Sequence, residues 1–290
     1  MKQRSALYWL VPLIAVLAII MTSVGIFSRG GSAPYSFTTV YGDQVEIYGR
    51  GIYSHDSLLA ASLLRGTDCV TLFLAVPLLL VGYLLYRRGS FRGGIFLTSM
   101  LIYFLYVGAT YTFSVLFNRL FLVYVMLFST GFFAAIVALT MFDVDSLSSK
   151  LSPAAPRRGM TIFMIVAGLG TFMLWLSDLI GPLMNGTAPV NLGPYTTMFT
   201  HGFDSAIITP ATVLTGILLL RRKPLGDFLV ALLLILCTLI GAVVIAQTIS
   251  QTLEGIVFPI GVYIGMIGSW VVMGSFAIGL TIQYFRHMSI

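Results

Sequence analysis

The sequence predicts an all-α integral membrane protein with eight transmembrane helices and a small extracytoplasmic cap. Two observations lead to this fold class. Of the 290 residues, 58% are hydrophobic and only 9% are charged, whereas soluble domains carry about 25% charged residues. The apolar residues also gather into segments of about 20, and a helix of that length crosses a hydrocarbon core of about 30 Å. We therefore expect a multi-pass protein of the cell membrane, with the lipid bilayer as its main partner.

Four spans are expected in the first half of the chain. The first, about residues 6–27, follows a basic start, but its apolar run is longer than the 7–15 residues of a signal-peptide core. We therefore expect it to remain as a helix. The other three are expected at 69–86, 93–117 and 120–142, and Pro77 is expected to kink the second span.

Residues 29–67, between the first two spans, are predicted to form the cap. Apolar and polar residues alternate from Ser36 to Tyr48 on both sides of Gly42-Asp43, a pattern typical of a β-hairpin. From Ser54 to Arg65 the leucines share one helical face. This favours a short amphipathic helix with Ser54 as N-cap and Gly66 as its stop.

A polar connector at 143–158 separates the first half from four further spans, expected at 160–179, 205–220, 228–246 and 255–285. Pro259 is expected to break or tilt the last one. The sixth span has only sixteen residues, about 24 Å of helix, which is too short for the bilayer. Its helix should therefore begin earlier, and this would place Asp204 and His201 below the outer interface.

The basic residues predict the orientation. With eight spans, twelve of the sixteen Lys and Arg residues fall on the side of the two termini, and only Arg29, Arg50, Arg65 and Arg119 fall on the other. The positive-inside rule then places both termini in the cytoplasm. The acidic residues divide the opposite way, with three inside and seven outside.

The two halves share an order of features that suggests a parallel 4+4 repeat. In each half an acidic residue precedes an apolar span with an internal proline, and an arginine pair ends that span. The residues are Asp68, Pro77 and Arg87-Arg88 in the first half, and Asp204, Pro210 and Arg221-Arg222 in the second. Four spans per half would give both halves the same orientation.

The candidate site consists of ionisable residues near the outer ends of the spans. Such groups in a membrane are costly unless they are paired or face water, so they indicate function by default. The predicted ligand-binding residues are Arg65, Asp68, Arg119, Asp178, His201 and Asp204, with the two arginines and the histidine as partners for the three acids. No motif for a nucleotide, a metal or covalent catalysis is present, so no cofactor or metal is expected and catalytic residues are unknown.

Simpler roles exist for several of these residues. Asp68 and Asp204 could cap the helices that follow them, and Arg65 and Arg119 could anchor the chain at the head groups. Asp178 is harder to explain in this way, because it is predicted at the C-terminal end of a helix, where the dipole disfavours an anion. It should therefore have a specific partner.

Several segments of the chain resemble a family of uncharacterised bacterial membrane proteins with eight spans. The segments are YGRGIYSHDS, RGTD, FNRLFLVY (Phe117 to Tyr124), LWLSD (Leu174 to Asp178) and RRKPLG (Arg221 to Gly226). In that family an acidic residue follows the LWLS segment and His-x-x-Asp precedes the sixth span, and Asp178, His201 and Asp204 match those positions. The resemblance implies the topology and the choice of residues, and it brings no activity.

Three functions follow from these expectations. The favoured one is binding or transport of a small molecule or lipid through a polar pocket on the extracytoplasmic side. The second is a membrane enzyme or a haem or metal redox protein that uses His55 and His201. The third is a structural subunit that binds a protein partner through residues 29–67. The net charge of +6 follows from the topology and is not evidence for a nucleic-acid partner.

Overall fold

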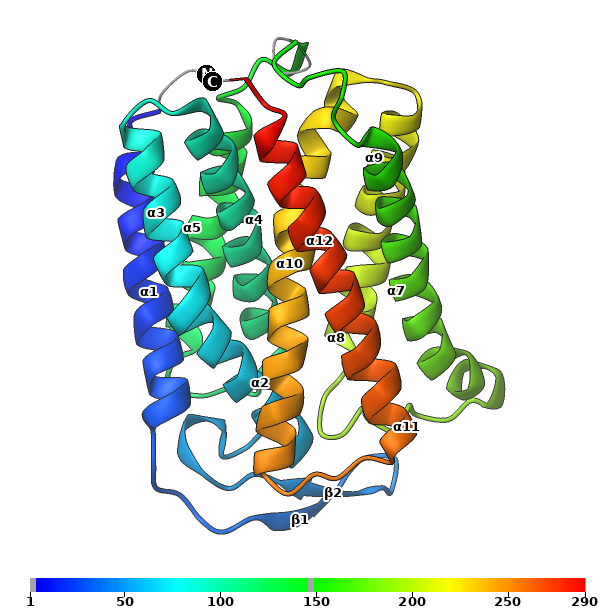
Figure 1. The fold of residues 1–290 in the computed structure, drawn as a ribbon. Helices are drawn as coiled ribbons and strands as arrows, with labels where there is room; N and C mark the ends of the chain where they lie inside the picture. The colour runs from blue at the N-terminus through cyan, green and yellow to red at the C-terminus, as the bar shows by residue number, and fades with distance from the viewer. Residues whose placement is uncertain (1–3, 146–148, 290) are drawn as a thin grey trace.

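Seven helices of the described chain are long and apolar enough to cross a membrane. The structure is a computed structural model that describes residues 4–145 and 149–289. Its helices stand side by side in a bundle, and a two-stranded sheet lies across one end (Figure 1). We call this the hairpin end. The mostly helical bundle agrees with the predicted class of a multi-pass membrane protein.

The first half follows the predicted order. Helix α1 (Leu7–Phe27) leads to the strands β1 (Tyr35–Thr38) and β2 (Gln44–Ile47), which pair antiparallel as a hairpin, and then to the short 3₁₀ turn η1 (Gly51–Tyr53). The next helices are α2 (Leu58–Val70), the π-helical turn η2 (Thr71–Ala75), α3 (Val76–Arg87), α4 (Phe91–Ser114) and α5 (Phe121–Leu139). The predicted hairpin is therefore confirmed. Residues 146–148 of the predicted connector lie outside the described residues.

The second half has a similar order of helices. Helix α7 (Arg157–Asn185) is followed by α8 (Phe199–Phe203), the π-helical turn η3 (Asp204–Ile208), α9 (Thr209–Leu220) and α10 (Pro224–Leu253). The last segments are α11 (Ile260–Tyr263), the π-helical turn η4 (Ile264–Gly268) and α12 (Ser269–Arg286). The helix of the sixth span does begin upstream of residue 205, as its short apolar run predicted.

Proline accounts for two of the π-helical turns. Pro77 and Pro210 each stand at the second residue of the helix that follows a π turn. A proline inside a helix has no N–H to donate to the preceding turn, and a π turn is one way in which a helix accommodates the lost bond. The irregularity expected at Pro77 is thus a π turn within a continuous helix from Leu58 to Arg87.

The separate cap helix predicted for 54–65 is wrong. The helix begins at Leu58, with the Ser57 side chain rather than Ser54 as its N-cap, and it runs through Gly66 into the second span. Gly66 does not stop the helix. Its missing side chain instead lets α2 pack closely against α10. A Cβ atom at this position would lie 2.5 Å from the backbone of Gln247. Arg65 and Asp68 therefore lie on the same continuous helix as the second span and are not separated from it by a helix end.

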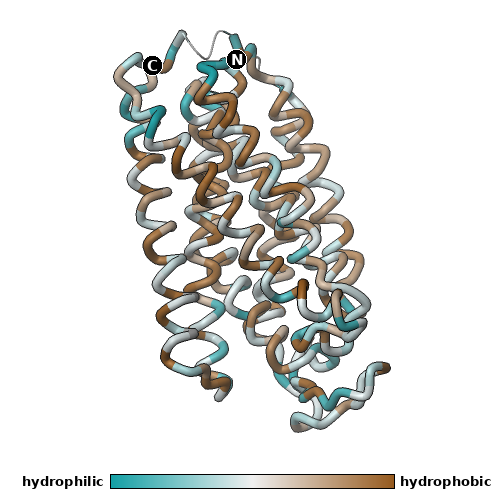
Figure 2. Tube along the Cα trace, turned by 90° about the vertical axis from the view of Figure 1, so that its right-hand side faces the viewer, coloured by the Kyte–Doolittle hydropathy of each residue, from teal (hydrophilic) through white to brown (hydrophobic). Residues whose placement is uncertain are grey.

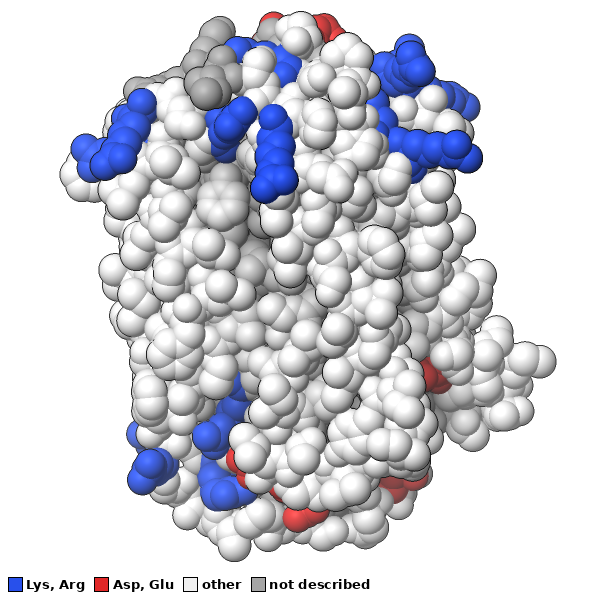
Figure 3. All heavy atoms as spheres, in the orientation of Figure 1, with Lys and Arg blue, Asp and Glu red and all other residues white. Residues whose placement is uncertain are grey.

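Helices α4 and α10 form the interior of the bundle, since they are the most buried of the seven. In Figure 2 the hydrophobic residues lie along the middle of the helices, and hydrophilic residues gather toward the two ends. Lys and Arg concentrate at the end opposite the hairpin, while Asp and Glu accompany fewer basic residues at the hairpin end (Figure 3). Helix α1 begins and α12 ends at that basic end (Figure 1).

Candidate functional site

The structure divides the six predicted site residues among separate environments. Asp178, His201 and Asp204 form one cluster on α7, α8 and η3. Arg65 and Asp68 both lie on α2 but have different partners, and Arg119 lies in the loop between α4 and α5. The sequence suggested one pocket lined by all six residues. The side chains do not meet in one pocket.

Asp68 is fully buried and bonded to tyrosines. Its Oδ2 accepts a hydrogen bond from the Tyr53 hydroxyl at 2.7 Å, and its Oδ1 accepts one from the Tyr111 hydroxyl at 2.8 Å. Burial and the nearby carboxylate raise the pKa of Tyr53 well above its usual value, so this hydroxyl keeps its proton and remains a donor. Asp68 lies inside a helix, so the capping role considered for it is wrong.

Arg65 pairs with Glu254 and not with Asp68. The Arg65 guanidinium lies 3.7 Å from Glu254 Oε1 and donates a hydrogen bond to the Tyr48 hydroxyl. Arg50 binds the other oxygen of Glu254 at 2.6 Å, and the Tyr48 hydroxyl donates to Oε1 at 2.9 Å. Burial and the bond to Glu254 raise the pKa of Tyr48. Glu254, at the end of α10, thereby ties the cap to α2.

The second-half cluster contains the partner expected for Asp178. His201 Nε2 lies 3.2 Å from Asp178 Oδ2, and the His201 ring packs on the Trp175 ring with centroids 4.0 Å apart. The helical-dipole argument for Asp178 is wrong, because α7 continues to Asn185 and the dipole acts only within the last turn. The partner is a histidine one helix away, on α8.

Asp204 is linked to the same cluster through Trp175. The indole Nε1 of Trp175 donates to Asp204 Oδ2 at 3.1 Å, and the Tyr106 hydroxyl on α4 donates to Oδ1 at the same distance. The sequence does not indicate this role for Trp175, because a tryptophan near a span end usually anchors the helix at the membrane interface. The sequence does not indicate Tyr106 either, because nothing in it shows that α4 faces both halves.

The cluster leads from the surface into the bundle. The side chain of Asp178 is 46% exposed and that of His201 is 11% exposed, while Asp204 is buried at 7%. Asp204 also lines a small cavity of about 30 Å³, together with Gly168, Thr212, Cys237 and Trp270. By volume alone, a cavity of this size has room for about one water molecule.

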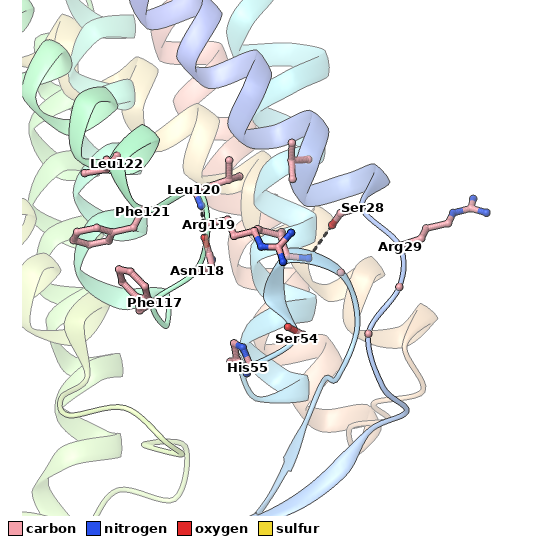
Figure 4. A pocket seen from close by; sticks show the side chains of 15 residues that line it. Ser28, Arg29, Ser54, His55, Phe117, Asn118, Arg119, Leu120, Phe121 and Leu122 are labelled. Atoms are coloured by element: carbon pink, nitrogen blue, oxygen red, sulfur yellow. Dashed lines mark hydrogen bonds between the residues drawn. The ribbon is translucent and has the colours of Figure 1, made fainter.

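Arg119 lies apart from the acids and is exposed, beside a larger groove of about 980 Å³ at the hairpin end (Figure 4). The groove is also lined by Arg29 and His55. His55 and His201 thus belong to different sites. Within residues 4–145 and 149–289, no group of three His, Cys, Asp or Glu side chains is placed to hold a metal ion.

Asp56 is a buried carboxyl that the predicted site left out. Its Oδ1 accepts hydrogen bonds from the Tyr195 hydroxyl at 2.9 Å and from the Leu116 N–H at 3.1 Å. Burial raises the pKa of Asp56 to about 7. The carboxyl joins the cap to the α4–α5 and α7–α8 loops.

No protein-family model, curated protein or solved structure matches the chain.

Proposed function

We propose that this chain is an eight-span protein of the cell membrane, with both termini in the cytoplasm, that binds or transports a small molecule or lipid on its extracytoplasmic side. The eighth span is the helix from Ile260 to Arg286, which follows Pro259 without a break in its helical turns. Its packing supports this, because a Cβ added to Gly241 of α10 would lie 3.3 Å from Gly274 of α12.

A parallel repeat of two four-helix halves is supported by equivalent contacts. Pro210 follows Pro77 by 133 residues, and each proline succeeds a π turn. With the same offset, Gly93 and Gly226 allow equivalent approaches, since an added Cβ would crowd Leu85 in the first case and Leu218 in the second. The same spacing relates Asp68 to His201. The acids Asp68 and Asp204 are then not the equivalent pair that the sequence suggested.

The ligand class that the second-half cluster fits best is a small cation. Two carboxylates, those of Asp178 and Asp204, flank the closely packed, tilted rings of Trp175 and His201, and neither is ion-paired to a Lys or Arg of the described chain. Aromatic faces and carboxylates together attract organic ammonium groups. One observation carries the proposal. Contacts run without a gap from the exposed Asp178 to the His201 ring, then to the Trp175 ring, and then to the buried Asp204.

The test is a binding assay on the full chain in lipid nanodiscs. Tetramethylammonium and a panel of primary amines should raise the melting temperature of the wild type, and matched carboxylic acids should not. Asp178→Asn and Asp204→Asn should each weaken the response at least tenfold. The control is Ser177→Ala, because the Ser177 hydroxyl is exposed and bonds only its own helix. A wild type that no cation stabilises, or an Asp178→Asn variant with full response, overturns the assignment.

Once a ligand is found in this way, a flux assay with that ligand distinguishes binding from transport. Flux of the bound amine into proteoliposomes that contain the wild type, absent with Asp204→Asn, indicates transport. Binding without flux restricts the proposal to binding.

The surface of the hairpin favours a second candidate, a partner-binding subunit. Val40 and Tyr41, at the hairpin turn, are 93% and 61% exposed although they are apolar. Exposed apolar groups at the tip of an extramembrane element are typical of an interaction surface. Co-purification of a stable protein partner that is lost in the double variant Val40→Ser, Tyr41→Ser would support this function.

A further inference from the structure

The four arginines at the hairpin end fall into two pairs with different environments. Arg50 and Arg65 share the carboxylate of Glu254. Arg29 and Arg119 are exposed, have no acidic partner among the described residues, and line one groove. Basic residues are disfavoured on the outer side of a membrane protein by the positive-inside rule, so two uncompensated arginines in one groove need an explanation.

The charge of the groove is positive. Three segments form it: the end of α1 with the residues after it, the turn η1 with the residues that follow, and the loop before α5. Its lining includes two arginines and His55 but no aspartate or glutamate. In Figure 4 Arg119 points across the opening between the end of α1 and the start of α5. An anionic group in this groove would meet cations and no opposing carboxylate.

The remaining walls of the groove are apolar. Phe117 and Leu122 line it on the α5 side and are 78% and 69% exposed, and Figure 4 shows both on the same flank of the opening. If the helices cross the membrane as proposed, the groove lies at the depth where the hydrocarbon core meets the head groups, because α1 ends and α5 begins beside it. The exposed apolar flank therefore faces acyl chains, and the arginines lie at head-group level.

Backbone and side-chain hydrogen bonds hold the groove in shape. The Ile52 N–H donates to the Ser28 hydroxyl at 2.9 Å, and the Gly51 N–H donates to the Gly30 carbonyl at 2.8 Å. Gly51 has a φ of 60°, and a Cβ there would lie 2.7 Å from the Ser28 carbonyl oxygen. On the opposite wall, Asn118 Oδ1 accepts from the Leu120 N–H at 2.9 Å. A ligand would bind to walls that are already ordered.

We propose that this groove binds an anionic phospholipid from the leaflet around the hairpin end. Arg29 and Arg119 contact its phosphate, and Phe117 and Leu122 contact the first part of an acyl chain. A soluble phosphate would use only the arginines, so the apolar flank selects the lipid. The proposal adds a lipid site to the proposed function and is independent of the Asp178 cluster, which the variants below leave intact.

The test compares lipid binding to the full chain and its variants in detergent micelles by native mass spectrometry. The probe is phosphatidylglycerol, with phosphatidylcholine as the neutral competitor. We expect the wild type to prefer phosphatidylglycerol, each of Arg29→Gln and Arg119→Gln to weaken its binding about fivefold, and the double variant to weaken it about twentyfold. Arg50→Gln is the matched control, since it removes one charge from the same face outside the groove.

Three results would overturn the proposal. The first is a double variant that binds phosphatidylglycerol as tightly as the wild type. The second is an equal loss with Arg50→Gln, which would indicate a general effect of charge. The third is equally tight binding of glycerol phosphate, which would assign the groove to a soluble anion. The Arg29 and Arg119 variants should keep the wild-type melting temperature without lipid, because both arginines are exposed.

Discussion

The Tyr111 hydroxyl on α4 donates a hydrogen bond to the Asp68 carboxylate on α2 at 2.8 Å, in a part of the bundle where both residues are fully buried. Tyr53 of the cap donates to the other oxygen. Three elements thus meet at one buried carboxylate, and α1 packs directly against it through Gly25. Such a group is stable only while all of its donors remain in place.

The first prediction is that Gly25→Ala destabilises the protein. A Cβ at Gly25 would lie 1.9 Å from Asp68 Oδ2 and 2.6 Å from the Tyr53 hydroxyl, so the new methyl group must displace the buried network. Overpacking of this kind costs about 1–3 kcal/mol, and the apparent melting temperature in detergent should fall by several degrees. Gly170→Ala is the control, because nothing lies within 4 Å of a Cβ there. Equal melting temperatures for the two variants would contradict the close packing at Asp68.

The second prediction is that Glu254→Gln loosens the cap. The glutamine would lose both ion pairs, with Arg50 and with Arg65, and these pairs connect the cap and α2 to the end of α10. Because Arg50 is half exposed, the expected loss is small, about 1 kcal/mol. Limited proteolysis should cleave residues 29–57 faster in the variant, while Glu46→Gln, an exposed change on β2, should leave the rate unchanged. Equal rates for the two would show that Glu254 does not hold the cap.

The lengths of the apolar segments predicted where the helices of this chain lie, but they did not predict that the second helix begins at Leu58. The predicted start at Cys69 rested on the charged residues Arg65 and Asp68, which normally lie outside a span. In the structure both lie on the same continuous helix as the span, where tyrosines bind Asp68 and Glu254 pairs with Arg65. Gly66 was interpreted as a helix stop from its type alone. Its contact with α10 involves residues about 180 positions away, and no local pattern reports that.

The sequence predicted which ionisable residues belong to the candidate site better than it predicted the side chains that bind them. The sequence indicated that Asp178 needs a specific partner and that His201 lies inside the sixth helix, and the structure brings the two together. It did not indicate Trp175 and Tyr106 as donors to Asp204, because a tryptophan or tyrosine near a span end is usually an interface anchor. Which side chains meet depends on how the helices are rotated, and almost uniformly apolar spans carry little information about rotation.

The third prediction concerns orientation. If both termini are cytoplasmic, a cysteine at Asp43 in the hairpin turn should react with a membrane-impermeant thiol reagent in intact cells, and one at Arg222 should react only after the membrane is permeabilised. Both positions are exposed in the structure. The background should carry Cys69→Ala and Cys237→Ala, which remove the two native thiols. The opposite labelling pattern would reverse the assignment drawn from the basic residues.

The fourth prediction is that the contacts of Asp56 weaken as pH rises toward neutrality. Burial raises the pKa of this carboxyl from 3.8 to about 7. Between these two values the native protein keeps the proton that the unfolded chain has lost, so the native state binds more protons. Stability from this group is therefore fully present below about pH 4 and is lost as pH rises to about 7, by an amount on the order of a few kcal/mol.

Asp56→Asn should remove this dependence, because an amide stays neutral and its oxygen can still accept from Tyr195 and Leu116. Hydrogen exchange of the Leu116 and Ser57 amides, corrected for intrinsic rates, should accelerate from pH 5 to pH 8 in the wild type and stay level in the variant. Asp43→Asn, at the exposed hairpin turn, should behave as the wild type. Protection at Leu116 that does not change with pH in the wild type would show that the buried carboxyl does not govern how the three outer segments are held together.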